Sequence, residues 1–143
     1  MERIDLIGYT CGWGAKRIEC RDGPVALKIM DIPAQLRKVG KSAYWSHFSH
    51  SDKEDSLLNK RDPLPIIAEY CDNVYQQVTK AVKHDDFPVV LGGDHSMAIG
   101  TWSAIANSLK EGQNLGLIWI DAHMDSHTRD TSHSGAYHGM PIS

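Results

Sequence analysis

The stretch Leu115-Gly116-Leu117-Ile118-Trp119-Ile120-Asp121-Ala122-His123-Met124-Asp125 decides the fold of this 143-residue chain. Its residues 115–120 are apolar at both alternating positions, which is typical of a parallel strand that is covered on both faces of its sheet. Ligand-type side chains begin where that strand would end. Because sites in open α/β sheets form beyond the carboxyl ends of the strands, we predict a buried strand over residues 115–120 that leads into a functional site.

The spacing of Asp121, His123 and Asp125 favours a metal site. In an extended chain these three side chains project to the same side. At ~3.3 Å per residue, however, ~13 Å would separate Asp121 from Asp125, which is too far for both to reach one ion. If the two carboxylates share one ion, the chain must curl directly after the strand, which leaves His123 free to face a neighbouring position. Two carboxylates and an imidazole suit a divalent ion such as Mn²⁺ better than a structural zinc.

A second motif of the same kind follows the apolar run Phe87-Pro88-Val89-Val90-Leu91. This run predicts another short strand, and it continues directly into Gly92-Gly93-Asp94-His95-Ser96. The two glycines permit a tight turn, and His95 falls at the junction between the strand and the next helix. The turn lacks the pattern of a phosphate-binding loop. Two parallel strands are thus expected to carry ligand-type residues to one edge of the sheet.

The rest of the chain alternates strands with helices. We predict strands over residues 4–9 and 43–48, a loop over 11–15, and a surface loop over 49–61. Helices are predicted from Asp22-Gly23-Pro24 onward with a break at Pro33 and a stop at Gly40, from Asp62-Pro63 onward to about residue 82, and from about Ser96 to Leu109. This order predicts βαβ units, a mainly parallel sheet and a single α/β domain over residues 1–143.

Composition and charge disfavour several classes of protein. A net charge of −3 gives no electrostatic basis for binding nucleic acid or a membrane surface. No apolar stretch approaches the ~20 residues of a transmembrane helix, and the first five residues are unlike a secretory signal. The three cysteines lack metal-ligand spacing, which favours free thiols over a disulfide framework. We therefore expect a cytoplasmic protein that binds neither nucleic acid nor membrane.

Histidines and hydroxyls are concentrated toward the end of the sequence. Five of the eight histidines lie between His95 and His138, and residues 126–143 form a polar segment with many hydroxyl side chains. Imidazoles gathered at one end of a fold suggest metal and proton chemistry, because histidine changes its charge near neutral pH. A hydroxyl-rich loop beside such a site suits a polar substrate.

Three motifs together resemble the ureohydrolases, and most closely the arginases: Gly92-Gly93-Asp94-His95-Ser96, Asp121-Ala122-His123-Met124-Asp125 and Ser134-Gly135-Ala136-Tyr137-His138-Gly139-Met140-Pro141. The resemblance is specific over residues 88–143 and weaker before them. It implies an α/β three-layer sandwich with a central, mainly parallel sheet. It also implies a site with two manganese ions, at which a metal-bridging hydroxide attacks the guanidinium carbon of L-arginine and yields L-ornithine and urea.

The resemblance implies a role for each ligand-type residue of the first two motifs. His95 resembles a ligand of one manganese ion, and Asp121 resembles the carboxylate that bridges both ions. His123 resembles a ligand of the second ion. Asp125 resembles a ligand of the first ion that also orients the hydroxide, which makes it a candidate catalytic residue.

The third motif and its neighbours resemble the substrate end of the family's site. His138 resembles a mobile histidine that shuttles protons, and is the second candidate catalytic residue. Ser132 and Ser134 match positions that hydrogen-bond the substrate's α-carboxylate. His127 and Ala136 stand where many arginases have asparagines near the amino-acid end of the substrate. The resemblance therefore implies a small guanidino substrate, and leaves open arginine or a related guanidino or formimino compound.

Arginases run on well past the position of Ser143, through a later aspartate motif with two further metal ligands. We therefore expect this chain to be the N-terminal part of an arginase-like domain, with a truncated sheet and an open strand edge. Asp121 and Asp125 bring two negative charges against four on two Mn²⁺ ions, so we expect this chain alone to hold the metal pair poorly. The family resemblance also implies a homo-oligomer for the full-length form.

Two other classes of function stay open. One is a metallohydrolase of the same broad fold, such as an agmatinase, a formimidoylglutamase or a deacetylase that acts on an amide. The other is a non-catalytic fragment that pairs with a partner through its open strand edge. A lone Asp-x-His-x-Asp after a strand is often only a hydrogen-bonded loop, so the metal reading depends on all three motifs together.

Overall fold

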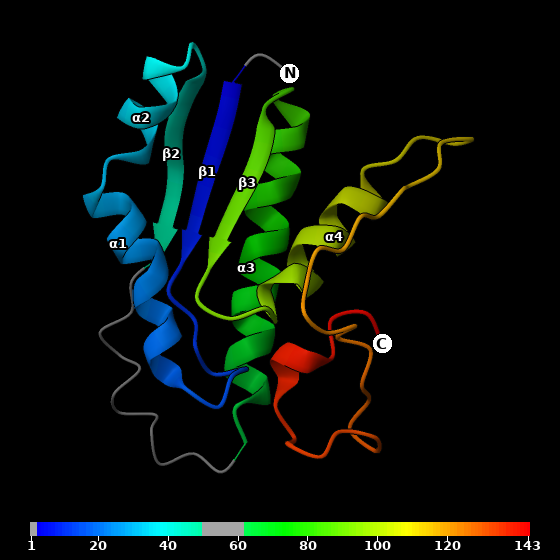
Figure 1. Cartoon of the computed structure of the whole chain (residues 1–143). Helices are drawn as coiled ribbons and strands as arrows, with labels where there is room; N and C mark the ends of the chain where they lie inside the picture. Colours follow the sequence, from blue (N-terminus) through cyan, green and yellow to red (C-terminus); the bar gives the residue numbers. More distant parts are fainter. Residues whose placement is uncertain (1–2, 50–61) are drawn as a thin grey trace.

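The computed structural model describes residues 3–49 and 62–143, which form one sheet with helices packed on both of its faces (Figure 1). The elements in chain order are β1 (Arg3–Tyr9), the short 3-10 helix η1 (Ile18–Asp22), α1 (Gly23–Ile29), α2 (Ile32–Lys38), β2 (Ser42–Ser49), α3 (Leu64–Lys83), β3 (Phe87–Gly92), α4 (Met97–Asn107) and the 3-10 turn η3 (Tyr137–Gly139).

Most predicted elements are confirmed. The strands over 4–9, 43–48 and 87–91 are each extended by one residue at one or both ends. Pro33 lies in the first turn of α2 and separates it from α1, and Gly40 has a left-handed φ of 75° just beyond the end of α2. Residues 50–61 of the predicted surface loop lie outside the described residues.

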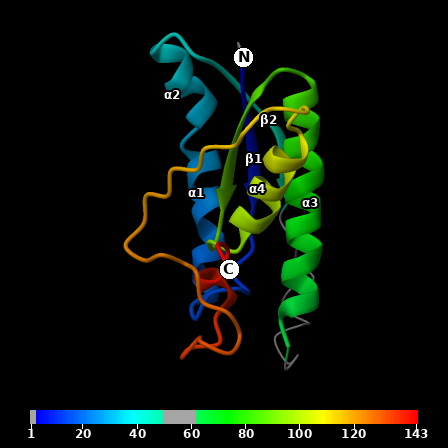
Figure 2. The same ribbon diagram turned by 90° about the vertical axis from the view of Figure 1, so that its right-hand side faces the viewer.

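The three strands are parallel and lie in the order β2-β1-β3. Side chains of β1 alternate between the two faces of the sheet, as the period of a strand requires. Ile7 and Tyr9 pack in one core with α3, whereas Ile4 and Leu6 face apolar side chains of α1 and α2. Figure 2 shows the resulting three layers, with α1 and α2 on one side of the sheet and α3 on the other.

The parallel strands place the loops that carry the candidate site residues at one end of the molecule. Figure 1 shows the C-terminal segment beyond the arrowheads of the strands, at their carboxyl ends. The apolar face of α3 comes from residues at helical spacing, such as Ile67, Cys71, Val74 and Val78, which are buried. This face holds α3 against β1 and α4. The carboxyl ends of β1 and β3 therefore stay open for the loops that follow them.

The predicted buried strand over residues 115–120 is wrong in this structure. The segment is extended, but it pairs with no strand among the described residues, and Ile118 and Ile120 are 83% and 93% exposed. An apolar run shows that a segment is suited to a buried strand. The strand forms only where a neighbouring strand offers hydrogen bonds and other elements cover both faces. No described strand supplies that neighbour. The carboxyl end of the segment nevertheless reaches the open end of the sheet.

A buried carboxyl group in β1 leads to a prediction about stability. The side chain of Asp5 is 3% exposed, and its Oδ1 atom has no hydrogen-bond partner. Burial raises the pKa of this carboxyl group above its ordinary value, although a hydrogen bond from Ser46 acts in the opposite direction. Because the pKa is higher in the folded state, the ionised group costs stability at neutral pH, and this cost disappears as the pH falls through both pKa values.

We expect Asp5→Asn to raise the free energy of unfolding at pH 7, because the variant carries no charge at this buried position. The difference from the unchanged protein should shrink as the pH falls toward the pKa of an unfolded carboxyl group. Urea denaturation at several pH values measures both effects. Asp72→Asn on the exposed side of α3 is the matched control, with no expected change. A loss of stability in Asp5→Asn at pH 7 would contradict this account.

Candidate metal centre

His95 is presented by a tight turn between β3 and α4. The carboxylate of Asp94, which is buried, fixes this turn through three hydrogen bonds. Its Oδ1 accepts from the backbone N of Ser96 (2.9 Å) and from Ser96 Oγ (2.5 Å), and its Oδ2 accepts from the backbone N of Gly14 (2.9 Å). The turn is therefore held both to the start of α4 and to the loop that follows β1.

The predicted curl after residue 120 is confirmed. Asp121 Oδ1 accepts a hydrogen bond from the backbone N of His123 (2.9 Å), which turns the chain directly after the extended segment. Asp125 has a left-handed φ of 49°, and its carbonyl oxygen accepts from the backbone N of Ile142 (2.9 Å). These contacts bring Asp121 and Asp125 to the same side of the turn.

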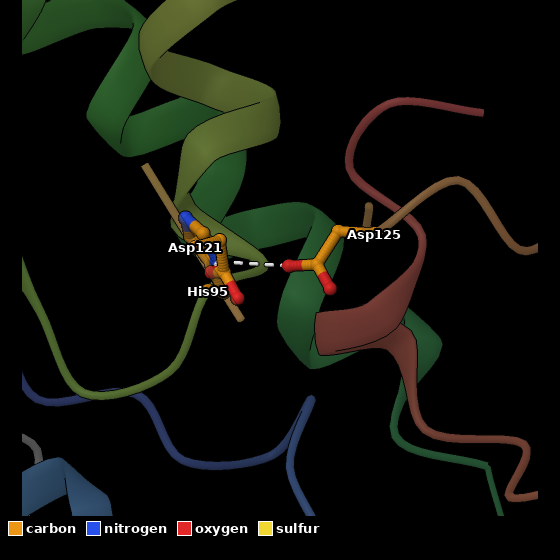
Figure 3. Close-up of side chains that lie close together, drawn as sticks. All are labelled: His95, Asp121 and Asp125. Carbon is orange, nitrogen blue, oxygen red and sulfur yellow. Dashed lines mark ion pairs between the residues drawn. The ribbon is translucent and has the colours of Figure 1, made fainter. Parts of the chain in front are cut away.

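The side chains of His95, Asp121 and Asp125 converge (Figure 3). His95 Nδ1 lies 3.0 Å from Asp121 Oδ2 and 2.8 Å from Asp125 Oδ2, and the three ligand atoms all lie within 4.8 Å of one another. The hydrogen bond from the His123 backbone is the main cause that holds the pKa of Asp121 below its ordinary value, and the charge of His95 adds to it. Both causes favour the charged form of this carboxylate, which is the form that binds a cation.

These residues fit a divalent metal ion. Imidazole nitrogen and carboxylate oxygen are ligands that Mn²⁺ and similar ions accept. The described residues that line the surrounding cavity include no lysine or arginine, so no side-chain cation of that kind neutralises the two carboxylates from within the cavity. A cation bound among the three ligand atoms would do so.

His123 lies beside this group but outside it. Its Nδ1 atom is 3.7 Å from Asp121 Oδ1, and its side chain is 82% exposed. This is the orientation expected when the chain curls and His123 faces a neighbouring position. Its role as ligand of a second ion stays a prediction.

The cavity beside the three ligands has a volume of about 730 Å³. Of the predicted substrate and catalytic residues, His127, Ser134 and His138 line it. Ser132 is not among its lining residues, but its Oγ lies 3.5 Å from Ser134 Oγ and accepts from the backbone N of Gly135 (3.1 Å). The structure thus brings the polar C-terminal loop to the candidate metal ligands.

Backbone contacts hold this loop over the cavity. The backbone N of His138 donates to the carbonyl oxygen of Gly14 (2.9 Å), and the backbone N of His127 donates to that of Gly139 (3.2 Å). Gly14 also donates to Asp94, so a single peptide segment connects the turn before His95 with the loop that carries His138. A Cβ atom at Gly14 would lie 2.6 Å from Asp94 Oδ1, which explains the absence of a side chain there.

Three residues of this site were not among the predicted site residues. Asp94 organises the turn, Cys20 lines the cavity, and Trp119 stacks on the ring of His95. An aspartate two residues before a serine is a turn signal that points to Asp94. Trp119 lies two residues before Asp121, on the same side of an extended chain, which is a signal for proximity. No sequence signal marks Cys20, because only the fold brings it to the cavity.

The prediction of free cysteines agrees with the structure. Cys11, Cys20 and Cys71 are free thiols. Among the helices in residues 3–49 and 62–143, none combines the length and the apolar character that crossing a bilayer requires.

The chain is similar to known arginases in sequence. The sequence matches the Arginase family over residues 2–143. The arginase of Bacillus subtilis (strain 168) is 50% identical over 147 residues, which cover 97% of this chain and 46% of that protein. The arginase of Bacillus caldovelox is 33% identical over 153 residues, which cover 99% of this chain and 48% of that protein.

The chain is also similar to an arginase in its fold. The native structure of the Bacillus caldovelox arginase at pH 5.6 matches with a TM-score of 0.83 and 31% identity, over 99% of this chain and 48% of that one. This confirms the predicted α/β class with its parallel sheet. The chain spans about half the length of the curated relatives that it matches. Because the family match extends over nearly the whole sequence, the chain belongs to the arginase family.

Proposed function

We propose that the protein is a metal-dependent ureohydrolase that converts L-arginine to L-ornithine and urea. The observation that carries this proposal is the convergence of His95, Asp121 and Asp125 in a cavity that Ser134 and His138 also line. Membership of the arginase family and its relatives named arginase support the choice of reaction.

The metal ligands are assigned as part of this proposal. His95, Asp121 and Asp125 would hold one Mn²⁺ ion, and Asp121 and His123 would contribute to a second. When bound, such ions lower the pKa of water and polarise the group under attack. Asp121 and Asp125 offset two of the four positive charges of an ion pair, so a complete site requires acidic ligands in addition to these residues.

The remaining residues would act on the substrate. Ser134 lines the cavity and carries a hydroxyl that can donate to a carboxylate, and Ser132 supports it at 3.5 Å. His127 also lines the cavity, and the family resemblance implies a place for it near the amino-acid end of the substrate. His138 also lines the cavity, with its backbone fixed by Gly14, and its imidazole would move protons to the leaving amine.

A substrate panel tests the proposal and separates its alternatives. In a full-length protein that supplies the further acidic ligands, and with Mn²⁺ present, we expect urea release from arginine and little from agmatine, which lacks the α-carboxylate. Preferential release from agmatine, or turnover of a formimino compound, would favour the other ureohydrolase activities. No turnover of any of them would favour a non-catalytic chain. The cytoplasmic location and the homo-oligomeric state stay predictions.

The variant Ser134→Ala tests whether this serine binds the α-carboxylate of the substrate. Loss of a hydrogen bond to a charged group costs about 1.5–3 kcal/mol, which corresponds to a loss of about 12- to 150-fold in kcat/KM for arginine. Any residual turnover of agmatine should be unchanged, because agmatine has no carboxylate for Ser134 to bind. Ser126→Ala, at another serine of the same cavity, is the matched control. Equal losses with arginine and agmatine would contradict the role of Ser134.

A further inference from the structure

We propose that Trp119 is a positioning residue, whose indole ring fixes the orientation of the His95 imidazole for metal binding. The two rings are stacked, with centroids 4.6 Å apart and planes inclined by 16°. This inference deepens the proposed function, because it concerns the same metal ligands and rests on their role as ligands.

The stack supplies a constraint that the carboxylates lack. The ring torsion of histidine is broad and roughly two-fold, so packing must select one ring plane. Asp121 and Asp125 contact Nδ1 and select which nitrogen faces them. The indole lies against the face of the imidazole and selects the ring plane. Because the side chain of His95 is 38% exposed, the surrounding protein encloses it only in part.

Trp119 also attaches the extended segment to the site. Within residues 113–120, every residue except Trp119 is exposed. The segment has no partner strand among the described residues, so the backbone hydrogen bonds of a sheet do not hold it. The contact between Trp119 and His95 thus joins this segment to the turn after β3, two residues before Asp121. The same contact orients one ligand and brings a second one toward it.

The fluorescence of Trp119 can report metal binding at His95. A paramagnetic Mn²⁺ ion bound to His95 lies close to the stacked indole and should quench its fluorescence. Trp13, Trp45 and Trp102 are the other indoles of the sequence. Trp102 in α4 is partly buried and is not stacked on His95, which makes Trp102→Phe the matched control.

The experiment is a Mn²⁺ titration by calorimetry and by tryptophan emission, with the variants Trp119→Leu, Trp119→Phe and Trp102→Phe. Trp119→Leu should weaken Mn²⁺ binding by about 2- to 12-fold, which is the range of an aromatic pair worth about 0.5–1.5 kcal/mol. Trp119→Phe keeps an aromatic ring and should bind nearly as well as the unchanged protein. Quenching should be largely lost in both Trp119 variants and persist in Trp102→Phe. Equal affinity in Trp119→Leu, or quenching that survives in it, would overturn the proposal.

An NMR measurement tests the stack of Trp119 on His95 without any catalytic turnover. In the metal-free protein, ring-current shifts should move the His95 ring-proton signals upfield in NMR spectra, and Trp119→Leu should abolish that shift. Absence of the shift in the unchanged protein would refute the stack itself. Metal binding that depends on Trp119 without urea release would uphold the inference and reject the proposed function. Urea release with no dependence of metal affinity on Trp119 would do the reverse.

Discussion

Replacement of Asp125 by asparagine is expected to weaken Mn²⁺ binding by more than about 100-fold. Residues that only support a metal ligand cost 10- to 100-fold when changed, so loss of an anionic ligand should exceed this range. Asp125 is 8% exposed and contacts His95 Nδ1 at 2.8 Å, so it lies within the convergent group rather than at its edge. Equilibrium dialysis followed by metal analysis measures the change.

Asparagine is a suitable replacement because it preserves the backbone. Asp125 has a φ of 49°, a left-handed conformation that asparagine and aspartate adopt more readily than most residues. The variant should therefore fold normally while it loses the negative charge. Asp130→Asn, on the exposed surface of the same polar loop, removes an equal charge outside the group and should bind Mn²⁺ normally. Equal affinity in the two variants would remove Asp125 from the set of ligands.

Replacement of Gly93 by alanine is expected to damage both stability and metal binding. A Cβ atom at this position would collide with the carbonyl oxygen of Cys11 and lie 2.7 Å from the Cα of Arg21. Both are backbone atoms, so rotation of a side chain cannot relieve the contact. Overpacking of this kind costs about 1–3 kcal/mol, and here it would also displace His95, two residues farther along.

Urea denaturation and Mn²⁺ titration measure the two effects of Gly93→Ala. Gly116→Ala is the matched control, because a Cβ atom there meets nothing within 4 Å and the residue does not have a left-handed φ. We expect the control to retain stability and metal affinity. A stable Gly93→Ala protein that binds Mn²⁺ normally would show that the β3–α4 turn tolerates movement, contrary to the packing described above.

The sequence was sufficient for elements whose signals are local. The runs at β1 and β3 predict strands because their apolar side chains suit burial, and the helical spacing of Val74 and Val78 predicts the face of α3. The curl after residue 120 followed from distance and from the assumption that Asp121 and Asp125 share one ion, since the two side chains cannot meet on an extended path. The same reasoning placed His123 toward a neighbouring position.

The features that the sequence could not supply depend on contacts between distant segments. The apolar run before Asp121 has the composition of a buried strand, but pairing depends on a neighbour that the described residues do not provide. The hydrogen bond from the backbone N of Gly14 to Asp94 joins the loop after β1 to the turn after β3. The stack of Trp119 on His95 likewise requires the fold to bring two loops together.

Anomalous scattering from crystals grown with Mn²⁺ would show directly whether these residues bind the ion. We expect a peak about 2.0–2.3 Å from His95 Nδ1 and from a carboxylate oxygen of both Asp121 and Asp125, the usual range for such bonds. The peak should be absent in crystals of Asp121→Ala. A well-ordered map without a peak between these three side chains, or a peak that survives in Asp121→Ala, would contradict the assignment of this group as a metal centre.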